Sequence, residues 1–456
     1  MPLSSKHAQV SNSDADDDRK MHQAQYRNVL EPRYKKNLLI AALPPLPSDA
    51  ELATALEVRV EAAELERSYS KERRLSLAHA VEDLVVPLPR LVRLARAMFI
   101  LLHEGYRHRA PDSPGAAEAL RKSCELQASC DFGPNGPAPR AQQNSMALIG
   151  ASGCGKSFGL QHIMRLILPK IWHESLGKWQ IPYLYIEMSF DGDSIHSLAS
   201  SIFEELDYYL PGENYTDQFM KRERLNALQR LAVALNIARE HNVGTIVVDE
   251  ANYERDPAQK IARFRKEAAA HRSPRQAKEL HAETPLSRLL VTASNRSRIP
   301  LIFSGTLEML RKVSPRFSQG RRMSGRGSSV WHPLSLVAEP GMPISEYEML
   351  HHALGKCQWN KKLLNIDGNS VAMFHEYDQG IPDIAVKLWA SVQEASIASG
   401  LEEITRPLVK ATFEREFVMT QYCSIRVMTP TIASVATRWR TGYGTDEGGV
   451  GRGSQA

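Results

Sequence analysis

Residues 146–157 read Met-Ala-Leu-Ile-Gly-Ala-Ser-Gly-Cys-Gly-Lys-Ser, a short apolar run followed by a glycine-rich turn. The spacing G-x-x-x-x-G-K-S is that of a phosphate-binding loop. Its glycines permit backbone angles at which consecutive N–H groups converge on phosphate oxygens. Lys156 adds a positive charge beside the outer phosphates, and the Ser157 hydroxyl is a magnesium ligand. We therefore expect ATP and Mg²⁺ to bind here, on Gly150, Ala151, Ser152, Gly153, Cys154, Gly155, Lys156 and Ser157.

A second stretch, residues 245–250, is an apolar strand whose tip carries two carboxylates. Asp249, at the end of a buried strand, can hold magnesium directly or through water. Glu250 can orient and polarise an attacking water molecule. A solvated acidic turn is the alternative, and the phosphate loop upstream disfavours it. The two stretches together predict hydrolysis of a nucleoside triphosphate.

Two further candidates follow. Thr306, at the tip of a strand expected over 299–304, could bind the terminal phosphate or the attacking water, or it could cap the next helix; neither interpretation is favoured. Residues 314–327 carry an arginine cluster with Arg316, Arg321 and Arg322. In an oligomer one of these arginines could reach a neighbour's phosphate. The alternative is a basic surface loop that contacts nucleic acid.

Strand and helix signals alternate around these motifs, which predicts a parallel sheet covered on both faces. Besides the strand of the phosphate loop, strands are expected at 183–188, 245–250, 299–304 and 330–334. Apolar periodicity predicts helices at 158–168, 195–206 and 228–235. The order places a further strand between the phosphate-loop strand and the acidic strand. The fold class is therefore α/β, with a five-stranded parallel sheet.

A chain of 456 residues is too long for one ordinary core, so we expect several domains. The expected parts are a disordered tail at 1–25, an N-terminal arm and helical region at 26–140, an α/β core at 141–336, a helical lid at 337–418 and a flexible or partner-binding tail at 419–456. Within the second part, Leu56, Val60, Ala63 and Leu65 suggest one helix and residues 91–102 another. The lid should contain helices at 344–354, 371–377, 381–397 and 406–417.

Bulk composition narrows the class of protein. The net charge of +5 permits nucleic-acid binding without arguing for it. The first twenty residues are polar and lack the apolar core of a signal peptide. Apolar runs are too short to span a bilayer, and five cysteines argue against a disulfide framework. We expect a cytoplasmic protein with no membrane partner.

Several stretches in order resemble one family. They are YRNVLEPRYKKNLLIAALPPLP from Tyr26, HEGYRHRAP from His103, the phosphate loop, VGTIVVDEA, IPLIFSGTLEML, PRFSQGRRMSGRGSSVWHPL and GIPDIAVKLWASVQEASI. Together they resemble a AAA+ ATPase, and more narrowly the TnsC-type regulators of DNA transposition. The match runs from about Tyr26 to about residue 418, and it is more specific than the nucleotide motifs alone.

The resemblance implies a function. ATP-bound subunits would assemble as a ring or helical filament around double-stranded DNA and link a target-selection protein to the transposase, and slow, DNA-stimulated hydrolysis would reset the assembly. The selector, an RNA-guided complex or another protein, is left open. Residues 150–157 would bind nucleotide, Asp249 and Glu250 would handle magnesium and water, Thr306 would be the first sensor, and Arg321 or Arg322 the arginine finger.

One position departs from the wider AAA+ pattern. Where a second sensor arginine often stands, this chain reads Gly380-Ile381-Pro382-Asp383, and an acid there cannot pair with phosphate.

A helicase loader or replication initiator with the same core is the competing interpretation. A small-molecule kinase ranks last because it leaves the acidic pair and the arginine cluster unexplained. Lys221, Arg222, Arg224 and the basic stretch 253–285 are candidate DNA contacts, although a solvated helix explains them as well.

Overall fold

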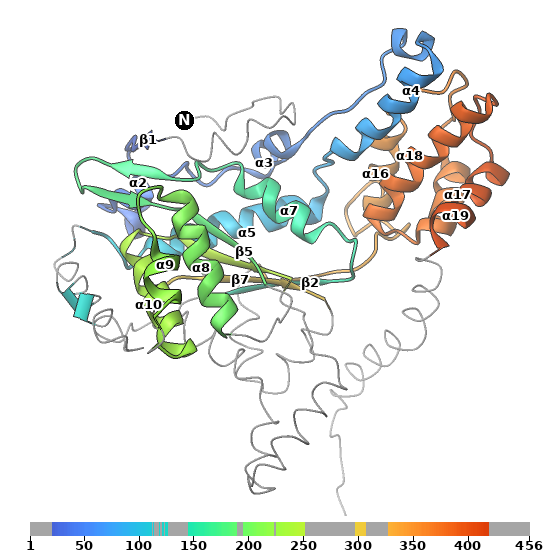
Figure 1. Ribbon diagram of the computed structural model, residues 1–456. Coiled ribbons are helices and arrows are strands. Elements are labelled where there is room, and N and C mark those ends of the chain that lie inside the picture. Colours follow the sequence, from blue (N-terminus) through green and yellow to red (C-terminus); the bar gives the residue numbers. More distant parts are fainter. Residues whose placement is uncertain are drawn as a thin grey trace, which may run out of the picture.

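The computed structural model describes residues 21–111, 145–188, 195–222, 225–250, 297–306 and 327–418, with a few positions between 113 and 125. The main sheet consists of β2 (Met146–Gly150), β5 (Tyr183–Glu187), β6 (Thr245–Asp249), β7 (Leu301–Gly305) and β8 (Ser329–Trp331). Its order is β5-β6-β7-β2-β8, and all of these neighbours are parallel (Figure 1). The predicted five-stranded parallel sheet is confirmed, including the strand inserted between β6 and β2.

The last strand differs from its predicted range. It was expected at 330–334, but β8 ends at Trp331. Pro333 follows shortly afterwards and has no backbone N–H to donate to the ladder, so pairing with β2 stops early. Gly150, at the end of β2, lies against this strand, because an added Cβ there would come within 2.4 Å of the Trp331 carbonyl oxygen. Only glycine fits where β2 turns into the phosphate loop.

Helices cover both faces of the sheet (Figure 1). On one face lie α8 (Ile195–Tyr209), α9 (Tyr215–Met220) and α10 (Ala227–Glu240). On the other lie α2 (Leu38–Ala41), α3 (Asp49–Leu56), α5 (Pro89–Tyr106) and α7 (Lys156–Met164). The predicted helices at 195–206 and 228–235 are confirmed. The helix predicted over 158–168 begins at Lys156 and ends at Met164, because the amides of Leu166 and Ile167 bond three residues back and tighten the last turn.

The N-terminal region is tied to the start of β6. Tyr106 donates from its hydroxyl to the Asn242 carbonyl at 2.7 Å. Arg109 donates to the carbonyls of Val243 at 2.7 Å and Gly244 at 3.1 Å. Gly105 fits closely as well, since an added Cβ would lie 2.9 Å from the Gly244 carbonyl oxygen. The turn after α5 therefore holds the strand whose far end carries the acidic pair.

Two local features differ from expectation. The helix predicted through Leu56, Val60, Ala63 and Leu65 is wrong, because α3 ends at Leu56 and the extended Val58 pairs with Val85 instead. β-branched valines favour this extended backbone. A small sheet of β1 (His22–Gln23), β3 (Ile171–His173) and β4 (Lys178–Gln180) was not predicted. β1 lies within the range 1–25 that was expected to be a disordered tail, and the sheet joins it to the segment after α7.

Four helices form the expected helical lid: α16 (Glu346–Leu354), α17 (Gly368–Asp378), α18 (Pro382–Ser399) and α19 (Arg406–Glu416). They share a core with residues from the N-terminal region, including those of α4 (Lys71–Ala78). The chain therefore leaves the sheet after α3, packs against the lid helices, and returns to the sheet with α5 (Figure 1).

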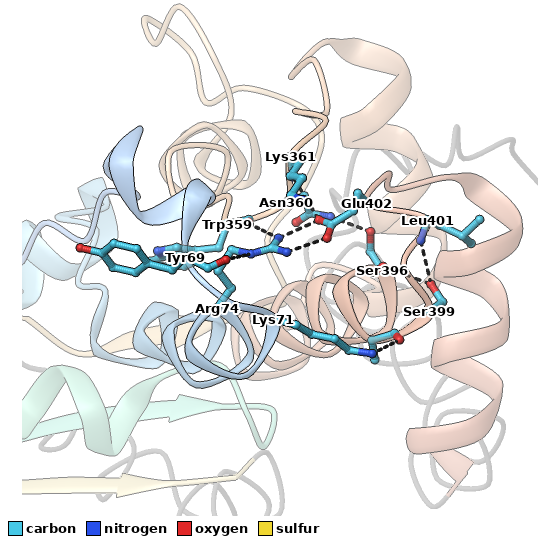
Figure 2. Close-up of polar contacts among 11 residues, drawn as sticks. Tyr69, Lys71, Arg74, Trp359, Asn360, Lys361, Ser396, Ser399, Leu401 and Glu402 are labelled. Carbon is cyan, nitrogen blue, oxygen red and sulfur yellow. Dashed lines mark hydrogen bonds and ion pairs between the residues drawn. The ribbon is translucent and has the colours of Figure 1, made fainter.

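One buried arginine fastens α4 to the lid (Figure 2). Arg74, with 3% of its side chain exposed, forms a bidentate pair with Glu402 at 2.6 and 2.7 Å. It also donates to the carbonyls of Trp359 at 3.0 Å and Tyr69 at 3.2 Å. All three nitrogens of the planar guanidinium group thus donate to acceptors, which suits arginine better than lysine. The N-terminal segment is held by a residue 328 positions away in the chain.

Among the described helices, none combines the length and the apolar character that a bilayer crossing requires. Several expectations lie outside the described residues. They concern the tails at 1–20 and 419–456, the basic stretch 253–285, Arg224, and the arginine cluster with Arg316, Arg321 and Arg322.

Candidate nucleotide-binding site

The phosphate loop has the predicted strand-turn-helix context. β2 ends at Gly150, and α7 begins at Lys156. Gly153 and Gly155 have φ angles of +78° and +81°, in the left-handed region that residues with a Cβ rarely adopt. Gly155 is the N-cap of α7. The helix therefore directs its N-terminal amides and the positive end of its dipole at the loop, as an anion site requires.

Lys156 is positioned by the loop itself. Its Nζ donates to the carbonyls of Gly150 at 3.0 Å and Ala151 at 2.9 Å. Burial lowers the pKa of Lys156, and the nearby Cys154, Asp249 and Glu250 oppose that shift. The acidic pair is therefore within electrostatic reach of the lysine, although about 90 residues separate the two motifs in the sequence.

Asp249 is 1% exposed and has hydrogen-bond partners on both carboxylate oxygens. Oδ1 accepts the Glu250 amide at 2.9 Å, and Oδ2 accepts the Tyr185 hydroxyl at 2.7 Å. Burial raises the pKa of Asp249, but the Ser157, Ser304 and Tyr185 hydroxyls and the Glu250 amide around the carboxylate outweigh burial, so the net pKa is lowered. The carboxylate is therefore charged at neutral pH, and the Ser157 hydroxyl lies beside it.

Glu250 directly follows β6, is exposed, and has a φ of +51°. This backbone angle turns the chain away from the strand direction immediately after Asp249. Thr306 directly follows β7, so it lies at the same edge of the parallel sheet as Glu250. The structure thus brings the phosphate loop, the acidic pair and Thr306 to one edge. Arg321 and Arg322 lie outside the described residues.

The lid reaches this edge through the first turn of α18. The Asp383 amide donates to the Gly153 carbonyl at 3.1 Å. An added Cβ on Gly153 would lie 2.8 Å from Cγ2 of Ile381, so the two chains are in close contact. The Asp383 carboxylate pairs with Lys387 one turn later, at 2.8 Å. Asp383 occupies the position where AAA+ proteins often carry a sensor arginine. It therefore contacts the phosphate loop through its backbone and not through its side chain.

Two contacts at the site were missed from the sequence. The first is the hydrogen bond between Tyr185 and Asp249, since the sequence placed Tyr185 in a strand and gave it no role. The alternation of side chains along β5 does place Tyr183, Tyr185 and Glu187 on one face of the sheet. The contact between Ile381 and Gly153 had no local signal.

The candidate DNA contacts Lys221 and Arg222 have local partners. Lys221 pairs with Asp217 at 2.7 Å, and Arg222 lies 4.9 Å from the centre of the Phe219 ring.

The residues present fit ATP with magnesium. Ser157 and Asp249 supply hard oxygen donors, which Mg²⁺ prefers, and the loop supplies amides and an ammonium group for phosphate. Over the part of the chain that the structure describes, no three His, Cys, Asp or Glu side chains cluster into a metal site. Mg²⁺ is commonly held by one or two carboxylates together with phosphate oxygens and water, which agrees with this donor set.

Residues 140–313 match the model of a protein family described as an AAA domain. This part of the chain is therefore similar to AAA domains. The matched range includes the phosphate loop, the acidic pair and Thr306, which the structure places at one edge of the sheet. A search of curated proteins finds no match to this chain.

Three solved structures have a similar arrangement over part of their length. The ORC1 protein of Aeropyrum pernix in complex with DNA is 16% identical, covers 69% of this chain and 68% of its own, and has a TM-score of 0.34. Cdc6p from Pyrobaculum aerophilum is 15% identical, with 64% of each chain covered and a TM-score of 0.33. Drosophila ORC bound to DNA is 12% identical, with coverages of 76% and 74% and a TM-score of 0.31. Similarity this low says nothing of function.

Proposed function

We propose that this AAA+ protein is an ATP-dependent, DNA-binding regulator of transposition. Its subunits assemble as a ring or filament on double-stranded DNA and link a target-selection protein to the transposase. One observation carries the ATPase part of the proposal: Lys156, Asp249 and Glu250 meet at a single edge of the sheet, beneath the first turn of α18. The transposition part is supported by the ordered stretches that resemble TnsC-type regulators, from Tyr26 to about residue 418.

Each residue at the edge has a defined role in this proposal. Lys156 and the amides of residues 150–157 bind the phosphates of ATP. Ser157 and Asp249 hold Mg²⁺, which supplies charge compensation for the phosphates when it is bound. Glu250 accepts a proton from the attacking water, and the bond to the leaving ADP oxygen breaks to release phosphate. Thr306 donates to the terminal phosphate.

The active unit in this proposal is a homo-oligomer. Arg321 or Arg322 of one subunit stabilises the terminal phosphate bound by its neighbour, since an arginine finger supplied in trans offsets transition-state charge. ATP at the subunit boundary then favours assembly, and hydrolysis weakens it. DNA is held through its phosphates by basic side chains along the assembly, which needs no sequence-specific contact.

A helicase loader or replication initiator with the same core is the second candidate. The two candidate functions differ in the protein partner. Co-assembly on DNA with a transposase would support the first, and co-assembly with a replicative helicase would support the second.

The proposal is tested first by ATP turnover. We expect the purified protein to release phosphate slowly, and duplex DNA to stimulate it. Lys156→Ala should abolish nucleotide binding and DNA-dependent assembly together, because the phosphates lose their ammonium partner. Lys178→Ala, a lysine in the β4 hairpin away from the loop, is the control and should behave like the unaltered protein. Absence of nucleotide binding by the unaltered protein would contradict the proposal.

A further inference from the structure

Tyr185 lies between the two elements that carry the proposed magnesium ligands. Its hydroxyl donates to Asp249 Oδ2 at 2.7 Å, and Gln161 of α7 donates to the same hydroxyl at 3.4 Å. Gln161 is four residues after Ser157, so both project from the same face of α7. A chain of side chains therefore runs from α7 through Tyr185 to the end of β6.

The χ2 torsion of aspartate has a broad distribution, so the side-chain rotamer does not by itself fix where the carboxylate oxygens point. At Asp249 two hydrogen bonds on different oxygens do fix it. The Glu250 amide binds Oδ1 and the Tyr185 hydroxyl binds Oδ2. An ionised carboxylate only accepts, so the phenol is necessarily the donor. The lone pairs that remain on the carboxylate are available for a metal or its water.

We propose that Tyr185 is a positioning residue for magnesium: it orients the Asp249 carboxylate and sets its separation from Ser157. This inference rests on the proposed ATPase function. Partners that orient metal ligands typically change metal affinity or activity by about 10- to 100-fold when they are removed. Tyr185 does not touch the nucleotide in this role, so it acts only through Asp249.

A second tyrosine in the same strand is a matched control. Tyr183 lies on the same face of β5 and also donates from its hydroxyl, but to the Met98 carbonyl of α5 at 3.2 Å. It is buried and distant from the acidic pair, since the β5–β6 register places it opposite Thr245. Tyr183→Phe removes a hydroxyl that donates to the backbone of α5. Tyr185→Phe removes one that serves Asp249.

The experiment measures binding of ATP carrying a methylanthraniloyl fluorophore, first in EDTA and then with increasing MgCl₂. Tyr185→Phe should bind the labelled ATP in EDTA as the unaltered protein does, and should need about tenfold more Mg²⁺ to reach half of the magnesium-dependent gain in affinity. Tyr183→Phe should leave that Mg²⁺ midpoint unchanged. The readout is binding, so it does not depend on turnover.

A double-variant cycle separates coupling from general damage. In an Asp249→Asn background, adding Tyr185→Phe should shift the Mg²⁺ midpoint no further. An unchanged midpoint for Tyr185→Phe alone, or an equal shift in both backgrounds, would overturn the positioning role. If the unaltered protein shows no magnesium-dependent binding of ATP, the proposed function itself fails, which is a different result from either of these.

Discussion

The backbone N–H of Asp383 donates a hydrogen bond to the carbonyl oxygen of Gly153 across 3.1 Å. This contact joins the first turn of α18 to the middle of the phosphate loop. Gly380, three residues before Asp383, is similarly constrained, because its carbonyl accepts the Leu334 amide at 2.6 Å. The lid helices and the sheet therefore meet at the candidate nucleotide site.

Gly153→Ala tests this contact in the nucleotide-free protein. Gly153 and Gly155 both have positive φ, so alanine at either costs about 1 kcal/mol of backbone strain. Only at Gly153 does the new Cβ meet Ile381, at 2.8 Å, whereas nothing lies within 4 Å at Gly155. Gly153→Ala should therefore lower the free energy of unfolding more than Gly155→Ala, measured by urea denaturation. In an Ile381→Ala background the two glycine variants should lose the same stability, because the methyl group that the new Cβ at Gly153 would meet is absent. Equal losses in the two glycine variants with Ile381 in place would rule out the lid contact.

Glu250→Gln tests the catalytic carboxylate. The amide keeps the shape of the side chain but cannot accept a proton from water, so turnover should fall about 100-fold or more while ATP stays bound. The trapped ATP should stabilise the assembly on DNA. Steady-state phosphate release measures the first effect. Glu187→Gln, at the tip of the neighbouring β5, is the matched control and should turn over normally. Unchanged turnover in Glu250→Gln would show that the catalytic assignment is wrong.

Arg74→Ala tests the attachment of α4 to the lid. It leaves Glu402 without its bidentate partner in a largely buried site (Figure 2), which should cost about 3 kcal/mol of stability. Thermal unfolding followed by circular dichroism should show a lower midpoint. Arg73→Ala removes the adjacent, exposed arginine, which contacts only the ring of Tyr69 in the described contacts, and should change the midpoint little. Equal effects of the two variants would contradict the attachment.

The buried Asp378 makes the stability of the lid depend on pH. Burial raises its pKa to about 7, against hydrogen bonds from Tyr347 at 2.7 Å and the Gly380 amide at 2.8 Å. The folded state therefore retains a proton that the unfolded state has lost above about pH 4. The contribution of this group to stability is greatest below that pH and is lost as the pH rises through 7.

Asp378→Asn removes this titration and keeps an acceptor for Tyr347. The difference in unfolding free energy between Asp378→Asn and the unaltered protein should grow in favour of the variant from pH 5 to pH 8, measured by urea denaturation. A difference that does not change with pH would contradict the raised pKa.

Local periodicity was enough to predict the main-sheet strands, apart from the bounds of β8, and the lid helices, because each buries an apolar face that repeats along the chain. The small sheet of β1, β3 and β4 was not predicted. The phosphate loop and acidic pair were predictable because their chemistry demands fixed residue types at fixed spacing. Contacts between segments that are distant in the sequence could not be predicted in this way. Arg74 and Glu402 form a pair that no local pattern records, and the Tyr185 contact with Asp249 depends on which strands are neighbours. The N-terminal packing against the lid was missed for the same reason.

The central claim is that ATP makes copies of this chain assemble on double-stranded DNA. Mass photometry or electron microscopy of the purified protein with duplex DNA, with and without ATP and magnesium, tests it most directly. We expect rings or filaments on DNA only when ATP is present, and none with Lys156→Ala. The same oligomeric state and the same DNA binding with and without nucleotide would contradict the account.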